Sequence, residues 1–153
     1  MASIDKAHIV NAALIMHLGQ PAAFSIDGQT ALGGIVDTVW PLLIDKTFGL
    51  HDWTFCRRTS KLTRKEATPV TGWRFAFELP GDKVGDPLKI MSHPQHTERP
   101  LRDYYLEAFE VHANEPELWA RCRVTVAPQY WEPAFRACFT LALAAALAVP
   151  VLQ

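Results

Sequence analysis

Hydrophobic positions follow a helical spacing at the two ends of the chain and a strand-like alternation in its middle. Near the N-terminus, Ile9, Ala13 and Met16 fall on one face at helical spacing. Ser3 can cap this first predicted helix, because a serine side chain accepts a hydrogen bond from a free backbone N–H. Gly19 is expected to end it, since glycine favours the position after a helix.

A second helix is predicted by a longer apolar stripe. Its positions are Leu32, Ile35, Val36, Val39, Leu42 and Leu43. Pro41 lies inside the stripe and removes one backbone hydrogen bond, so we expect a kink or a break near Trp40, itself a predicted core residue. Gly49 is expected to end this helix.

The third predicted helix is apolar on nearly every side. Pro133 suits its first turn and Pro150 is expected to end it. The predicted contacts between the second and third helices join Val39, Leu42 and Leu43 to Leu141, Leu143 and Leu147. The apolar run from residue 137 to 152 is shorter than the ~20 residues that cross a bilayer, so no membrane span is predicted. A helix this apolar exceeds what a small bundle covers, which favours an oligomer.

The middle of the chain alternates apolar and polar residues between prolines and glycines, as half-buried strands do. The predicted strands are Trp73–Phe77, Leu88–Met91, Tyr104–Val111 and Leu118–Val126. They predict a small antiparallel sheet with irregular loops.

Together these elements predict an α+β fold in one domain, 1–153. Residues 1–50 and 128–150 form a helical bundle of two N-terminal helices and one C-terminal helix, and 51–127 form a β-rich insertion of antiparallel strands. Trp53 and Phe55 are predicted to lie at the hinge between the two parts, with Trp53 largely buried.

Composition narrows the class of protein. Of 153 residues, 49% are hydrophobic and 20% charged, which is typical of a globular chain, and the net charge of −1 gives no overall attraction to nucleic acid. The three cysteines, Cys56, Cys122 and Cys138, form no C-x-x-C pair, so we expect reduced thiols. The first residues lack the basic start and apolar run of a signal peptide, which favours assembly in the cytoplasm.

The histidines give a weak signal for metal. His93 and His96 have a loose ligand spacing and His112 lies further along, but zinc sites need three or four ligands held together, commonly with cysteine pairs. We therefore expect surface histidines, with no metal and no cofactor.

Catalytic motifs are equally weak. Asp82 and Asp86 flank a glycine and could act as an acid–base pair, but both residue types are common in turns. Cys56 lies near His51 in sequence, which does not establish a thiol nucleophile. The sequence contains neither a phosphate-binding loop nor a G-x-S-x-G motif. We therefore expect that this protein is not an enzyme.

A basic cluster follows the hinge. It consists of Arg57, Arg58, Lys61, Arg64 and Lys65. One interpretation is a surface that contacts phosphate or an acidic partner. The other is a solvated face whose charge is balanced by acidic residues elsewhere, and local charge alone does not distinguish the two. If it is an interface, reversing Arg57 and Arg58 to Glu leaves the subunit folded and impairs assembly.

Four stretches, in order along most of the chain, resemble the head–tail adaptor family of tailed phages, typified by tail tubular protein A. They are L-G-Q-P at 18–21, W-P at 40–41 leading to L-H-D-W-T-F at 50–55, W-R-F-A-F-E-L-P-G-D at 73–82, and R-V-T at 123–125 followed by Tyr130, Pro133, Phe135 and an Ala/Leu-rich helix. The chain departs from the family at Gln20, usually Glu, and at Val126, usually Asp.

The resemblance implies a structural subunit of the virion neck. Such subunits form a twelve-fold ring below the portal protein, extend the channel through which genomic DNA passes, and dock the next neck or tail protein. The family has no catalytic residues to transfer. Two alternatives remain: a small soluble ligand-binding domain or enzyme with the β-rich insertion as a lid, and a DNA-binding module, whose affinity would fall steeply with salt.

Overall fold

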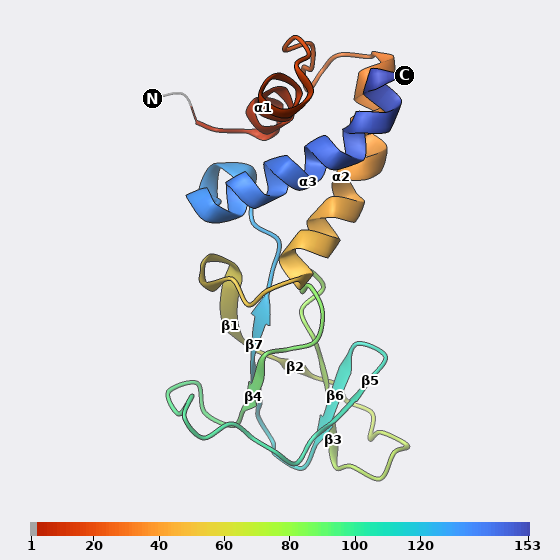
Figure 1. Ribbon diagram of the computed structural model, residues 1–153. Coiled ribbons are helices and arrows are strands. Elements are labelled where there is room, and N and C mark those ends of the chain that lie inside the picture. The colour runs from red at the N-terminus through yellow and green to blue at the C-terminus, as the bar shows by residue number, and fades with distance from the viewer. Residues whose placement is uncertain (1–2) are drawn as a thin grey trace. The chain divides into compact units, whose positions relative to one another are not determined.

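The computed structural model describes residues 3–153, which form two compact units. One unit joins the N-terminal residues through His51 to Val126–Gln153, and the other is Asp52–Thr125. The first is helical and the second contains two antiparallel sheets, so the predicted α+β class is confirmed (Figure 1).

The helical unit contains α1 (Lys6–Leu18), α2 (Ala31–Gly49), a short 3-10 helix η2 (Pro128–Tyr130) and α3 (Pro133–Leu152). α3 packs against both α1 and α2 (Figure 1). The predicted Ser3 cap is wrong: Asp5 caps α1, and its carboxylate accepts a hydrogen bond from the His8 N–H at 3.0 Å. Gly19 ends α1 as predicted, in the left-handed conformation (φ 62°) that glycine adopts without strain.

Both internal prolines lie inside continuous helices, so the predicted end at Pro150 is wrong, and Pro41 causes no break in α2. Val36 precedes Pro41 and Phe48 follows it, and both side chains are fully buried, so packing holds both halves of α2 despite the lost hydrogen bond. Pro150 lies in the last turn of α3, where few backbone bonds depend on it.

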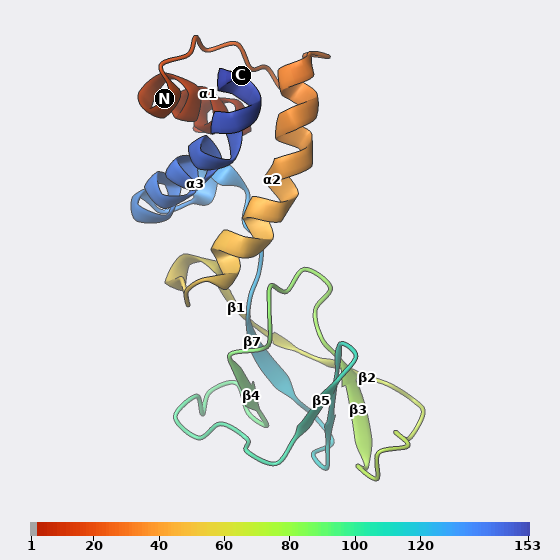
Figure 2. The same ribbon diagram turned by 45° about the vertical axis from the view of Figure 1, so that its right-hand side comes forward.

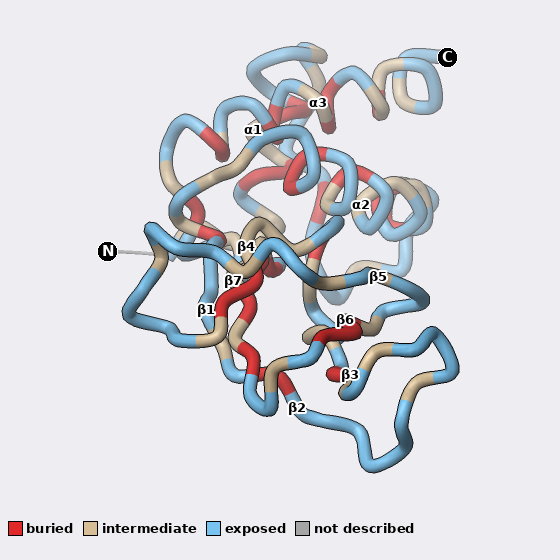
Figure 3. The backbone as a smooth tube through the Cα atoms, turned by 90° about the horizontal axis from the view of Figure 1, so that it is seen from below, coloured by how far each residue is buried: buried red, intermediate tan, exposed pale blue. Residues whose placement is uncertain are grey.

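One face of α3 forms the core of the helical unit. Phe135, Phe139, Leu143 and Leu147 are fully buried, which confirms the last two as core residues. Figure 3 shows buried and exposed stretches alternating along the helices. The predicted contacts of Leu42 and Leu141 are wrong, because these side chains are 67% and 57% exposed.

Aromatic rings fill the space between α2 and α3. Trp40 stacks on Trp131 with ring centroids 5.9 Å apart, and its ring meets Phe139 edge-on at 4.9 Å. Phe48 lies 4.6 Å from Phe135 by the same measure. Trp40 is half-buried, and its predicted place in the core is at the border of this aromatic cluster.

The β-rich unit has two antiparallel sheets in place of the single predicted sheet. The first, in the order β1-β7-β4, contains β1 (Arg57–Lys61), β7 (Trp119–Arg123) and β4 (Lys89–Met91). The second, in the order β2-β3-β6-β5, contains β2 (Thr63–Arg64), β3 (Phe75–Glu78), β6 (Glu110–Ala113) and β5 (Tyr105–Glu107) (Figure 2). A 3-10 helix η1 (Thr54–Cys56) precedes β1. The chain passes from one sheet to the other at Leu62, which is buried.

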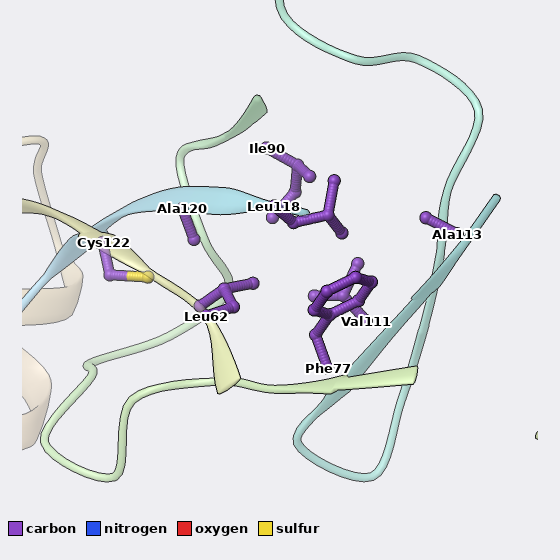
Figure 4. Close-up of a cluster of buried hydrophobic side chains, with 8 residues drawn as sticks. All are labelled: Leu62, Phe77, Ile90, Val111, Ala113, Leu118, Ala120 and Cys122. Atoms are coloured by element: carbon purple, nitrogen blue, oxygen red, sulfur yellow. The ribbon is translucent and has the colours of Figure 1, made fainter. Parts of the chain in front are cut away.

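Side chains from both sheets meet in one core (Figure 4). The members are Leu62, Phe77, Ile90, Val111, Ala113, Leu118, Ala120 and Cys122. The sequence pattern predicted one buried face along Leu118, Ala120, Cys122, Val124 and Val126. The first four of these are buried, in and beside β7, whereas Val126 is only half-buried. The single strand predicted over Tyr104–Val111 is wrong, because the backbone reverses at Ala108 and Phe109 and forms the β5–β6 hairpin.

The tryptophans of this unit are only partly buried. Trp53 is neither exposed nor fully buried, and its ring centroid lies 6.4 Å from that of Phe55. It lies in the first residues of the β-rich unit, which begins at Asp52. Trp73, which precedes β3, is also half-buried.

Candidate interface

The outer face of α3 is apolar along its whole length. Its exposed residues are Pro133, Ala134, Ala137, Cys138, Leu141, Ala145, Val149 and Leu152. They recur every three or four positions, opposite the buried face, so they form one ridge. The ridge carries no charged side chain. An uninterrupted apolar ridge on an exposed helix is typical of a surface that another molecule covers.

α3 also has the length and composition of a membrane span, since it is 20 residues long and strongly apolar. It is longer than the run on which the sequence prediction was based, because the helix includes Pro133 and the turn after it. One third of its most apolar 18-residue window (33%) is buried against the rest of the protein. Its aromatic residues pack on α2, as those of a core helix do.

The predicted basic cluster lies on β1 and β2, and its arginines are tied to carboxylates. Arg57 donates two hydrogen bonds to Asp52, at 2.8 and 2.6 Å. Arg58 does the same to Asp82, at 2.7 and 2.6 Å, and these bonds lower the pKa of Asp82 and raise that of Arg58. Two-pronged pairs of this kind fix the orientation of both side chains.

The lysines of the cluster are also neutralised. Lys61 lies 3.2 Å from Glu117, and Lys65 pairs with Glu110. Arg64 differs: its guanidinium lies over the Phe75 ring at 5.0 Å and donates to a backbone carbonyl at 3.4 Å. Among residues 3–153 it is the member of the cluster without a carboxylate partner.

These ion pairs weaken the case that the basic cluster contacts phosphate, and they change which charge reversal tests it. Reversing Arg57 and Arg58 to Glu places new carboxylates beside Asp52 and Asp82, so like-charge repulsion disturbs the subunit itself. Reversing Arg64 breaks no ion pair, because this residue has no carboxylate partner among residues 3–153. The sequence could not reveal this, because it does not show which acids lie beside the cluster.

His112 in β6 links Thr71 and Glu110 through hydrogen bonds, a set of three residues called the polar relay below. Its ring is buried, with Nδ1 2.6 Å from the Thr71 hydroxyl and Nε2 2.9 Å from a Glu110 carboxylate oxygen. Hydrogen bonds from Lys65 and then from His112 lower the pKa of Glu110. When Nε2 donates to Glu110, Nδ1 accepts a hydrogen bond from the Thr71 hydroxyl. Sequence reasoning treated His112 as a surface histidine and missed this relay.

The other candidate residues lie apart. His93 and His96 are exposed with ring centroids 5.8 Å apart, and within the described part of the chain no three metal-ligating side chains come together. Asp82 is engaged with Arg58. Cys56 is buried, its thiol donates to the Trp53 carbonyl at 3.2 Å, and burial raises the pKa of that thiol, so a reactive thiolate is disfavoured.

A scan against models of protein families finds no match, and a search of curated proteins finds none at a significant level.

Proposed function

We propose that this chain is a head–tail adaptor subunit of a tailed phage or phage-like particle. It forms a ring below the portal, surrounds the DNA channel and docks the next neck or tail protein. The observation that carries the proposal is the outer ridge of α3: a helix that buries Phe139 and Leu143 on one side exposes Leu141 and Val149 on the other. A ring subunit needs such surfaces, because each copy contacts two neighbours.

The position of the motifs supports the same proposal. L-G-Q-P at 18–21 forms the end of α1, and R-V-T at 123–125 lies at the end of β7, just before the chain returns to the helical unit. The neutralised basic cluster fits a wall that DNA passes without being held, since strong DNA binding needs uncompensated positive charge.

Particle composition tests the proposal. We expect the chain in purified particles, and we expect a deletion of its gene to give DNA-filled heads without tails. Leu141→Asp adds a charge to the outer ridge without altering the buried face, and should reproduce the deletion while the isolated subunit stays folded. Leu141→Ala is the matched control. Absence of the chain from particles, or normal tails after deletion, would contradict the proposal.

A second candidate function, an acyl-transferring enzyme, is favoured by one observation. The hydroxyl, imidazole and carboxylate of Thr71, His112 and Glu110 have the connectivity of a nucleophile, base and orienting acid. Incubation with an activated ester tests it by intact mass. Acylation of Thr71 that is lost in both Thr71→Val and His112→Gln would support an enzyme, and an unmodified chain would exclude this role.

A further inference from the structure

The tip of the β5–β6 hairpin presents an aromatic ring in an unusual backbone conformation. Ala108 and Phe109 have φ values of 46° and 70°, a region that Asn and Gly normally occupy in such turns. Phe109 is 79% exposed. Its carbonyl accepts the Leu79 N–H at 3.0 Å, and the Lys83 ammonium lies 5.4 Å from the centre of its ring. Held strain of this kind concentrates at functional positions.

The same tip carries an uncompensated negative charge. Glu107 is exposed, and among residues 3–153 it makes no ion pair. Its cross-strand neighbour Glu110 differs, because Lys65 and His112 hold it. The tip therefore combines an exposed phenyl ring with a free carboxylate.

A groove of complementary character lies elsewhere on this unit. It has a volume of about 380 Å³ and is lined by Lys61, Leu62, Arg64, Phe77, Pro116 and Glu117. Leu62 and Phe77 of this lining are buried in the core, so an entering ring would meet Pro116 and the aliphatic stems of Lys61 and Arg64. The guanidinium of Arg64, the basic-cluster residue without a carboxylate partner, would meet an anion. An aromatic anchor beside a charge pair is a typical arrangement at protein interfaces.

The tip and the groove lie at opposite edges of one sheet. β5 carries Glu107 and β2 carries Arg64, and these are the two outer strands of the order β2-β3-β6-β5. A contact from the tip of one copy to the groove of the next leaves a free tip and a free groove at the ends. Such a head-to-tail contact propagates, and it closes into a ring when the rotation between copies permits.

We propose that neighbouring copies of this chain join through the β-rich unit, with Phe109 of one copy seated in the groove of the next and Glu107 paired with Arg64. The inference rests on the proposed function, because it names the contact between ring subunits.

Charge exchange tests the pairing. Arg64→Glu and Glu107→Arg each place like charges in every contact, whereas the double variant restores opposite charges with the direction reversed. We expect each single variant to lower the yield of tailed particles about tenfold or more, and the double variant to recover most of it. Matched controls are Arg102→Glu and Glu66→Arg, which reverse exposed charges that neither line the groove nor belong to the hairpin turn. Circular dichroism checks that each subunit is folded.

Disulfide trapping separates failure of this contact from failure of the proposed function. In a Cys138→Ser background, Arg64→Cys and Glu107→Cys together should give a ladder of linked copies when lysates of particle-producing cells are treated with the thiol oxidant diamide, and either cysteine alone should not. A chain that purifies with particles but gives no ladder, together with no recovery in the double variant, would overturn the contact and leave the adaptor function standing. A ladder from a chain absent from particles would support the contact and contradict the adaptor function.

Discussion

Leu143→Ala tests the core of the helical unit. The Leu143 side chain is fully buried on α3, and truncation removes the three carbons beyond Cβ. At about 0.8 kcal/mol for each buried methylene-sized group, the lost transfer energy is about 2.4 kcal/mol. The cavity left between the helices adds to this, and core Leu→Ala substitutions cost about 2–5 kcal/mol in all. We expect the free energy of unfolding to fall by about 3–4 kcal/mol.

Leu141→Ala is the matched control, because it makes the same change on the same helix at a side chain that is 57% exposed. We expect its free energy of unfolding to lie within about 0.5 kcal/mol of the wild type. Guanidinium unfolding followed by far-UV circular dichroism reports mainly on the helices and so measures both variants. Equal losses for Leu141→Ala and Leu143→Ala would refute the assignment of the two faces of α3.

Three further outcomes follow from the structure. Trp53→Ala should cost about 1–2 kcal/mol, less than the ~3–5 of a fully buried tryptophan, because Trp53 is half-buried; denaturant unfolding measures this, and no loss would place its ring on the surface. The Arg58 hydrogen bonds lower the pKa of Asp82 from its ordinary 3.8. The pair therefore stabilises the fold above pH 3.8, and this stabilisation is lost as the pH falls through the lowered pKa. The melting temperature of Asp82→Asn should lack the fall that loss of this pair causes in the wild type at acid pH. Because α3 packs on two other helices, the chain should remain out of the membrane pellet after alkaline washing, and retention there would show that α3 spans a bilayer.

Much of the fold could be predicted because the three helices and the strands β3, β4, β6 and β7 carry buried residues. The spacing of apolar residues located all three helices, and alternation at 118–124 located β7 with the correct inward face. The hairpin at 104–111 was missed because its turn contains Ala108 and Phe109 in place of Asn and Gly. Pro150 misled the prediction because it lies in the last turn of α3, where few backbone bonds depend on it, and α2 continues through Pro41 without the break that was one of the two expected outcomes.

The candidate sites were harder to predict than the fold, because they are formed by residues far apart in the sequence. Arg58 and Asp82 are separated by 24 positions, and Lys61 and Glu117 by 56, so the sequence showed five basic residues without the acids that neutralise four of them. The relay of Thr71 and His112 spans 41 positions and was hidden for the same reason. The basic cluster as an interface therefore stays a prediction, now centred on Arg64.

An image of the particle neck by electron cryomicroscopy tests the central claim most directly. The adaptor proposal predicts a closed ring of copies of this chain directly below the portal, with the outer ridge of α3 covered by a neighbouring protein and DNA in the central channel. A neck in which no density fits this chain would contradict the proposal.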